Sequence, residues 1–274
     1  MNGAPERPSF RRILVGLDAS RQSLEALEAA ALLAAELSAE LTGLFVEDAG
    51  LLDIAALPGS RAHGAAGELD RAMMERALRI QARRARQAMA GIAERSRVQW
   101  SFRVTRGDIG RELLAAAAEC DLVTLGLTSA ASVGRARVGR TARSTAAAAG
   151  CAVLLYPPGQ RAMQPIAALA DGDPRVLETA AWLAERHGGR LLVLLDEPDA
   201  GKAKRLAATV ERQLSDRPLK VRLHQLGKAD IEEALRRAGF DYRGLLVMGR
   251  RHSLFRADLP QRLLEHLHCA LLLL

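Results

Sequence analysis

The sequence predicts an α/β fold made of two tandem five-stranded parallel sheets flanked by helices. Three observations support this class. Short, almost wholly apolar segments alternate with longer helical ones, as strands and helices do in a doubly wound sheet. Several apolar segments end in Asp or Gly just before the next helix. The same order of segments occurs twice along the chain, which indicates an internal repeat.

The first half alternates between strand and helix from its first apolar segment. RRILVGL (11–17) is predicted as a strand buried on both faces, and Ser20 as the N-cap of a helix that runs to about Leu37. Further strands are predicted at ELTGLFVED, ending near Val46, at 98–105, at DLVTLG and at CAVLLY. Helices are predicted at 69–95, 108–119 and TARSTAAAA. The resulting order, β-α-β-α-β-α-β-α-β, is typical of a parallel sheet.

A loop rich in Gly and Ala is predicted over 47–68. It contains an apolar run formed by Leu51, Leu52, Ile54 and Leu57. The run lies beyond the strand ends, where α/β sheets bind ligands. Two roles stay open for it: a lid over a site, or packing against the second half.

The second half follows the same order. Its first strand (165–170) leads to Asp171, and a helix then begins with Asp173 as cap and Pro174 at its first position. Further strands are predicted at RLLVLLDE, LKVRLHQLG, RGLLVMG and CALLLL, and helices at 200–214, DIEEALRRAG and 260–267.

The spacing between the two copies shows what the second has lost. Asp171 lies 153 residues after Asp18, whereas Gly227 lies 120 residues after Gly107, so the second copy lacks the 47–68 loop and part of the long helix. Cys269 lies 118 residues after Cys151, because the second copy is also about five residues shorter after its fourth strand. We predict one domain at 1–159 and a degenerate copy at 160–274, joined by QRAMQ after Pro157-Pro158-Gly159.

Composition narrows the class of protein. Hydrophobic residues make up 49% and charged residues 26%, a globular balance, and the formal charge of +7 attracts anions of many kinds. The start, MNGAPERPSFRR, lacks the apolar run of a signal peptide, and no apolar run approaches the roughly 18 residues of a membrane span. The three cysteines, an odd number, indicate free thiols. We therefore expect a cytoplasmic protein without membrane contact.

One short stretch resembles a phosphate-binding loop. Gly134-x-x-x-x-Gly139-Arg140-Thr141 differs from a P-loop only by Arg in place of Lys. Its context is wrong, because seven residues separate Gly134 from the strand end at Gly126. Gly139, thirteen residues after Gly126, is the position of interest.

Taken together, the strand ending VGLDAS, the second strand ending FVED, and the fourth strand leading through a Gly-containing loop and an Ala-rich helix to CAVLL resemble the universal stress protein family. The resemblance covers nearly the whole chain as two copies. It implies a Rossmann-like, adenine nucleotide alpha hydrolase-like fold with five parallel strands per copy. It also implies a role in stress tolerance and, in some members, ATP binding.

The family's nucleotide motif after strand four is G-x2-G-x9-G-[ST], and this chain matches it in part. Gly126 stands at the first position, Ser129 at the second, Gly139 at the third and Arg140 at the fourth, with Thr141 one place late. The resemblance further implies that Asp18 contacts the nucleoside and that Val46 lies near the base. Arg135, Arg137, Arg140 and Arg143 offer a charged grip on phosphate as an alternative to a backbone cradle. A degenerate site with solvated arginines is the other interpretation.

The second copy matches the motif less well. Its loop reads Gly249-Arg250-Arg251-His252, with His at the second glycine position and no later glycine. We expect this copy to be a structural partner whose final strand lies beside 151–156, so that the tandem chain forms an intramolecular pseudo-dimer and covers an exposed edge. Association of two tandem chains into a homodimer stays open.

Other classes of function are disfavoured. His266 and His268 are two residues apart and face different sides of a helix, so we expect no metal site. The arginines of 76–87 are interpreted as a solvated helix face, since the segment lacks the aromatic residues that bind single-stranded nucleic acid. No G-x-S-x-G, H-E-x-x-H or C-x-x-C motif is present, and we expect no enzyme activity.

The sequence thus predicts a non-catalytic stress-response protein with at most one ATP or anion site, in the first half. A scaffold that binds no nucleotide is the alternative. A weak ATP hydrolase is the weakest of the three hypotheses, because no metal-binding pair or catalytic base can be placed in the sequence.

Overall fold

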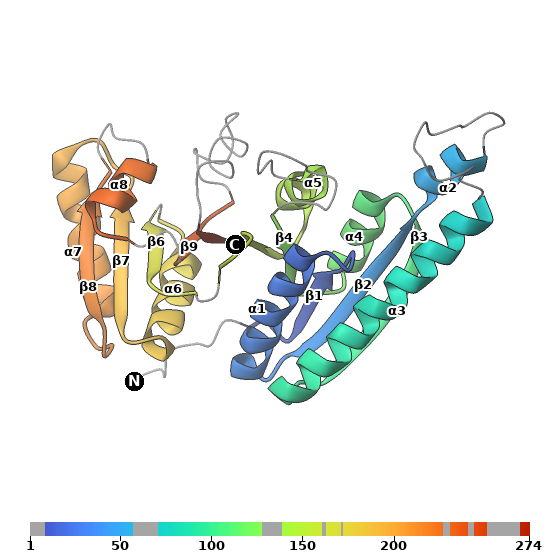
Figure 1. The fold of residues 1–274 in the computed structure, drawn as a ribbon. Helices are drawn as coiled ribbons and strands as arrows, with labels where there is room; N and C mark the ends of the chain where they lie inside the picture. Colours follow the sequence, from blue (N-terminus) through green and yellow to red (C-terminus); the bar gives the residue numbers. More distant parts are fainter. Residues whose placement is uncertain are drawn as a thin grey trace.

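The computed structural model describes residues 9–56, 71–127, 139–160, 163–170, 172–226, 231–240, 244–250 and 269–274. Figure 1 shows two α/β halves that share one sheet. The first half contains β1 (Arg12–Gly16), α1 (Arg21–Leu37), β2 (Glu40–Asp48), α2 (Ala49–Ala56), α3 (Arg71–Ser96), β3 (Trp100–Gly107), α4 (Ile109–Ala117), β4 (Leu122–Gly126), α5 (Arg140–Ala148) and β5 (Ala152–Tyr156).

The second half repeats this order in a shorter form. It contains β6 (Ile166–Ala170), α6 (Pro174–Arg186), β7 (Arg190–Leu195), α7 (Ala200–Leu214), β8 (Lys220–Gln225), α8 (Ile231–Arg237), β9 (Leu245–Met248) and β10 (Ala270–Leu273). The helix predicted at 260–267 lies outside the described residues.

The ten strands form a single sheet in the order β3-β2-β1-β4-β5-β10-β9-β6-β7-β8. Within each half all strand pairs are parallel, and the order of the second half mirrors that of the first. The α/β class is confirmed, and the two predicted sheets are continuous with each other. They meet where β5 pairs with β10 antiparallel, with Leu155 opposite Leu271. The expectation that the final strand lies beside 151–156 is therefore confirmed.

Helices on both faces bury the apolar strands. Alternate strand residues point to opposite faces, so Ile13 and Val15 belong to one core cluster and Leu14 to the other. The first cluster lies under α1, α3 and α6, and the second under α4, α5 and α8. Both clusters contain residues from each half. The two repeats are thus joined by side-chain packing as well as by backbone pairing.

The start of the predicted 47–68 loop is a helix instead. In α2 the side chain of Leu52 is only 1% exposed, and the Asp48 carboxylate accepts the N–H of Gly50 at 2.9 Å in the first turn. Burial of Leu52 and this capping contact favour a helix where we expected a loop. Figure 1 shows α2 beside α3, at the end of the sheet away from the second half. The predicted packing of this apolar run against the second half is therefore wrong for residues 49–56. Leu57, the last residue of the run, lies outside the described residues.

Among the described residues, no helix combines the length and apolar character needed to cross a membrane.

Candidate functional site

A cavity of about 140 Å³ opens at the carboxyl ends of β1, β2 and β4. This is the edge at which parallel α/β sheets bind ligands. Residues from the strand ends, from the first turn of α1, from α4 and from the start of α5 surround it. They are Gly16, Leu17, Asp18, Ser20, Ser23, Leu44, Val46, Ile109, Leu113, Leu125, Gly126, Gly139, Thr141 and Ala142.

A tight turn after β1 presents Asp18 to this cavity. Asp18 Oδ1 accepts the N–H of Ser20 at 2.9 Å, and Ala19 between them is left-handed, with φ of 59°. Ser20 then caps α1 as predicted, because its hydroxyl accepts the N–H of Ser23 at 3.1 Å. The Asp18 side chain is exposed. Its other oxygen, Oδ2, has no hydrogen-bond partner among the described residues, so it is free to accept one from a ligand.

Gly126 allows a close backbone approach at the end of β4. A Cβ atom there would lie 3.1 Å from the backbone carbon and oxygen of Gln22, in the first turn of α1. A side chain there would require the Gln22 backbone to move by a few tenths of an ångström. The glycine expected at this position thus has a physical reason in the fold.

The N-terminus of α5 forms another wall of the cavity. Gly139 is its N-cap residue, has no side chain to bond the helix, and donates its N–H to Leu127 O at 2.8 Å. The free N–H groups of a helix start, together with the helix dipole, favour an anion. Thr141 and Ala142 in the first turn also line the cavity.

Five of the seven predicted site residues, Asp18, Val46, Gly126, Gly139 and Thr141, line this one cavity. Arg140, between two of them, is exposed and does not belong to the described lining. Ser129 lies outside the described residues, as do Gly134, Arg135 and Arg137. No residue of α2 belongs to the described lining either, and the lid role stays a prediction.

Sequence reasoning missed the apolar wall that α4 contributes. Ile109 and Leu113 are four residues apart on α4, on the side that faces the cavity. An i, i+4 apolar pair directly after a strand is a signal that could have placed them.

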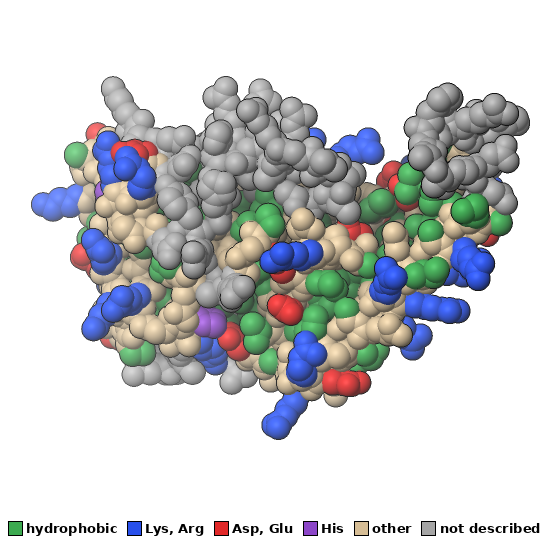
Figure 2. All heavy atoms as spheres, in the orientation of Figure 1, with side chains coloured by type: hydrophobic (Ala, Val, Ile, Leu, Met, Phe, Trp, Pro, Cys, Tyr) green, Lys and Arg blue, Asp and Glu red, His purple; other side chains and the backbone are tan. Residues whose placement is uncertain are grey.

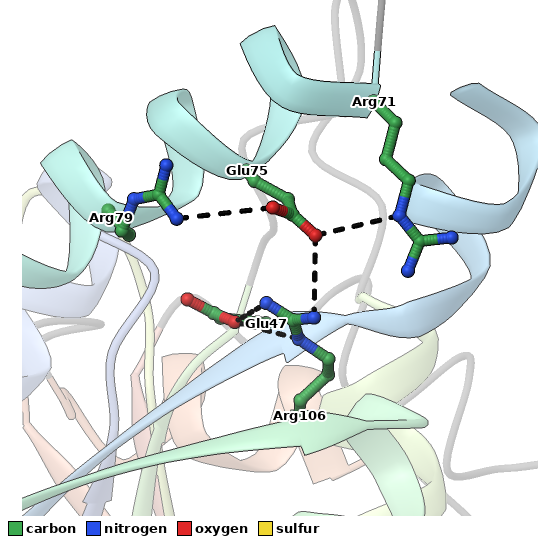
Figure 3. Close-up of polar contacts among 5 residues, drawn as sticks. All are labelled: Glu47, Arg71, Glu75, Arg79 and Arg106. Atoms are coloured by element: carbon green, nitrogen blue, oxygen red, sulfur yellow. Dashed lines mark hydrogen bonds and ion pairs between the residues drawn. The ribbon is translucent and has the colours of Figure 1, made fainter. Parts of the chain in front are cut away.

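An ion-pair network fixes the strand ends beside the cavity (Figure 3). Glu47 follows Val46 in β2, and its Oε2 accepts Arg106 Nε at 2.9 Å and Nη2 at 2.8 Å. Arg106 also contacts Glu75 at 3.5 Å, which joins β3 to α3. The hydrogen bond to Glu47 raises the pKa of Arg106, against a smaller opposing effect of burial. Arg71 and Arg79 complete the network around Glu75.

The arginine-rich part of α3 is a solvent-facing surface. Its side chains at 76, 79, 83, 84 and 86 are all exposed, and Figure 2 shows basic side chains gathered along this helix. This agrees with the predicted solvated face.

The second copy's site cannot be described in the same way. Asp171, Arg251 and His252 lie outside the described residues, and so do His266 and His268. The degenerate second site and the absence of a metal site therefore stay predictions. Within the part of the chain that the structure describes, no cluster of three or more His, Cys, Asp or Glu residues could hold a metal ion.

The fold and the cavity define a doubly wound α/β protein with a cavity at the carboxyl ends of its strands. A family model described as the universal stress protein family matches residues 9–157, more than half of the chain. The chain belongs to this family. No match was found among curated proteins.

Two solved structures with the same fold align with both halves of this chain. A universal stress protein from Archaeoglobus fulgidus is 13% identical, with a TM-score of 0.70, over 97% of this chain and 98% of its own. A putative universal stress protein from Pseudomonas aeruginosa is 16% identical, with a TM-score of 0.63, over 97% and 94%. At these identities the likeness shows the fold, and it does so for the tandem arrangement as a whole.

Proposed function

We propose that the first half binds an adenine nucleotide such as ATP in this cavity, and that the chain acts as a non-catalytic, cytoplasmic stress-response protein. One observation carries the proposal. Five of the residues predicted from the family resemblance, drawn from three strand ends and a helix start, line a single cavity. Membership of the universal stress protein family supports the stress-response role.

The size of the cavity indicates how a nucleotide would be placed. At about 140 Å³ it is smaller than the roughly 300–1,000 Å³ of sites that enclose a whole small molecule. It therefore fits one end of the nucleotide. Its apolar walls, including Val46, Ile109 and Leu113, suit a base, and the exposed carboxylate of Asp18 suits ribose hydroxyls. The phosphates would then lie towards the N-terminus of α5, where Arg140 is exposed to solvent.

We also propose that the β5–β10 pair takes the place of a contact between two separate subunits. The second half covers the β5 edge that a single copy would leave open, which makes the chain a pseudo-dimer of its own repeats.

Thermal unfolding of the full chain with millimolar ATP tests the nucleotide proposal. Bound ATP should raise the melting temperature, since a ligand at 100 times its Kd stabilises the folded state by about 2.7 kcal/mol. Val46→Trp should fill the cavity and abolish the rise, and Asp18→Asn should weaken it while keeping the turn to Ser20. Val104→Trp is the matched control, because Val104 is 50% exposed on the neighbouring β3 and does not belong to the described lining.

Three outcomes would contradict the proposal. If ATP does not raise the melting temperature, the alternative of a scaffold that binds no nucleotide is favoured. An equal rise with tripolyphosphate would show binding of anions by the basic chain, without recognition of the nucleoside. Phosphate release from ATP that is lost in Asp18→Ala would show a hydrolase instead.

A further inference from the structure

Two cysteines lie side by side at the amino ends of β4 and β5, away from the nucleotide cavity. Cys151 directly precedes β5, and Cys120 lies two residues before β4. The register pairs Leu122 with Ala152, and the Ala152 N–H donates to Asp121 O at 3.1 Å. Cys151 is therefore level with Asp121 and diagonal to Cys120. Both cysteines are half-buried and pack against the same core cluster, on one face of the sheet.

The spacing of two such positions suits a disulfide. Neighbouring strands are about 4.8 Å apart and one residue advances a strand by about 3.3 Å. Ideal strand spacing, extended to these two residues just before β4 and β5, would put their Cα atoms about 6 Å apart. Disulfides join Cα atoms that are roughly 4.4–6.8 Å apart. The bond therefore needs no large movement of the backbone.

The effect of one thiol's charge on the pKa of the other also indicates that the two sulfurs lie near each other. Burial raises the pKa of Cys120, and the charge of an ionised Cys151 raises it further. The charges of Asp121 and Glu119 also raise this pKa, whereas the Arg12 guanidinium lowers it. Burial likewise raises the pKa of Cys151, but there the Arg250 guanidinium and backbone hydrogen bonds at Cys151 and Val123 oppose the effect. Val123 belongs to β4, so the Cys151 sulfur lies towards that strand.

Arg250 lies against Cys151 and favours its thiolate over the neutral thiol. It follows β9 in the second half, and its Nη2 donates to the Cys151 carbonyl across the junction of the two halves. Its Nε is buried without a hydrogen-bond partner among the described residues. A guanidinium in this position stabilises an anionic sulfur, whether thiolate or sulfenate.

We propose that Cys120 and Cys151 form a thiol pair that hydrogen peroxide converts into an intramolecular disulfide. The Cys151 thiolate attacks one peroxide oxygen, the O–O bond breaks, and sulfenic acid and hydroxide form. The Cys120 thiolate then attacks the sulfenic sulfur, the S–O bond breaks, and hydroxide leaves as the S–S bond forms. In total two thiols lose two electrons and two protons, and one peroxide becomes two waters.

Cys269 is a built-in control for this reaction. It precedes β10 and is 1% exposed, and burial raises its pKa to about 12. The antiparallel register of β5 and β10 puts it beyond the Tyr156 end of β5, opposite to the Cys151 end. It should remain a thiol under conditions that oxidise the pair.

The test uses the reduced full chain with hydrogen peroxide, followed by catalase, alkylation of the remaining thiols and peptide mass spectrometry. We expect a single Cys120–Cys151 disulfide, two hydrogens lost, and Cys269 fully alkylated. Cys269→Ser should oxidise like the wild type. Cys120→Ser should stop at a Cys151 sulfenic acid that dimedone traps. The rate should rise about tenfold per pH unit from pH 7 to 9, because only the thiolate reacts and both pKa values are raised.

Other results would overturn the proposal. These are three free thiols after treatment of the folded protein, a disulfide that includes Cys269, or disulfide-linked dimers in place of the internal bond. Equal oxidation of Cys120 in the Cys151→Ser variant would overturn the assigned order of attack.

Discussion

Tyr156 is a buried residue whose environment makes stability depend on pH. It closes β5, is 4% exposed, and donates its hydroxyl to Gln160 O at 3.2 Å. Burial raises its pKa from 10.0 to about 12, with smaller contributions from Glu25 and Glu28. In the unfolded chain the phenol ionises near pH 10. Its stabilising contribution is therefore complete below pH 10 and is lost as pH rises towards 12.

We expect Tyr156→Phe to isolate this effect. Below pH 10 the variant should be less stable by roughly 0.5–1.5 kcal/mol, because it lacks the hydroxyl hydrogen bond. Between pH 10 and 12 the wild type should lose stability faster than the variant, so the difference should shrink. Urea unfolding at a series of pH values measures both curves. Parallel curves over this range would show that the phenol stays accessible to solvent.

At the residue scale, the sequence predicts several residues that line the cavity, but it does not predict the packing contacts around them. Gly126 and Gly139 are predicted from the family motif and Asp18 from the wider resemblance, and all three line the cavity. The reason for Gly16 was not visible in the sequence. A Cβ there would lie 2.6 Å from Leu125 Cδ2, on a strand more than a hundred residues later. The contacting atom is the end of a Leu side chain from a distant segment, and no local pattern in the sequence records such a contact.

Among the helices, α4 holds one wall of the cavity and depends on its cap. Asp108 is its N-cap residue, and Oδ1 accepts the Arg111 N–H at 2.9 Å. The helix is only 9 residues long, so a single cap satisfies a large share of its free N–H groups. Loss of the cap should loosen the turn that carries Ile109.

Asp108→Ala should therefore lower the free energy of unfolding by about 1 kcal/mol. Asp108→Asn keeps an acceptor at the same position and should stay close to the wild type. Chemical denaturation of the three proteins measures the difference. Equal losses in both variants would assign the effect to the charge of Asp108 and not to the cap.

Element boundaries followed the sequence closely where caps or apolar runs were strong. The helix capped by Ser20 ends at Leu37, as predicted, and α6 begins with Asp173 as cap and Pro174 in its first turn. The prediction of a loop over 49–56 is wrong because this stretch is rich in Gly and Ala, and Asp48 was assigned to the end of a strand and not to a helix cap. Its stability comes from tertiary burial of Leu52, which local propensity does not report.

For the whole molecule, the junction of the two halves should make unfolding cooperative. Leu272 in β10 is 1% exposed, and it belongs to a core cluster that includes residues of both halves. One tryptophan lies in each half, Trp100 in β3 and Trp182 in α6. Each can report on its own half when the other is replaced by Phe.

We expect Leu272→Ala to destabilise the chain by about 2–5 kcal/mol and to shift both tryptophan reporters equally. Leu32→Ala should change stability by less than about 0.5 kcal/mol, because Leu32 is 56% exposed. Urea unfolding followed by fluorescence measures each reporter. Separate midpoints for Trp100 and Trp182 in the wild type would contradict a single cooperative unit.

The antiparallel β5–β10 contact has a further consequence for the shape of the molecule. It reverses the strand direction between the halves, yet neighbouring strands in a sheet also rotate by roughly −20 to −25°. Over the nine steps of this ten-stranded sheet the rotation accumulates to about half a turn, which offsets the reversal. Figure 1 accordingly shows β2 and β7 ending on the same side. The strand ends of both repeats thus lie on one side of the molecule, although the two halves pair antiparallel at their junction.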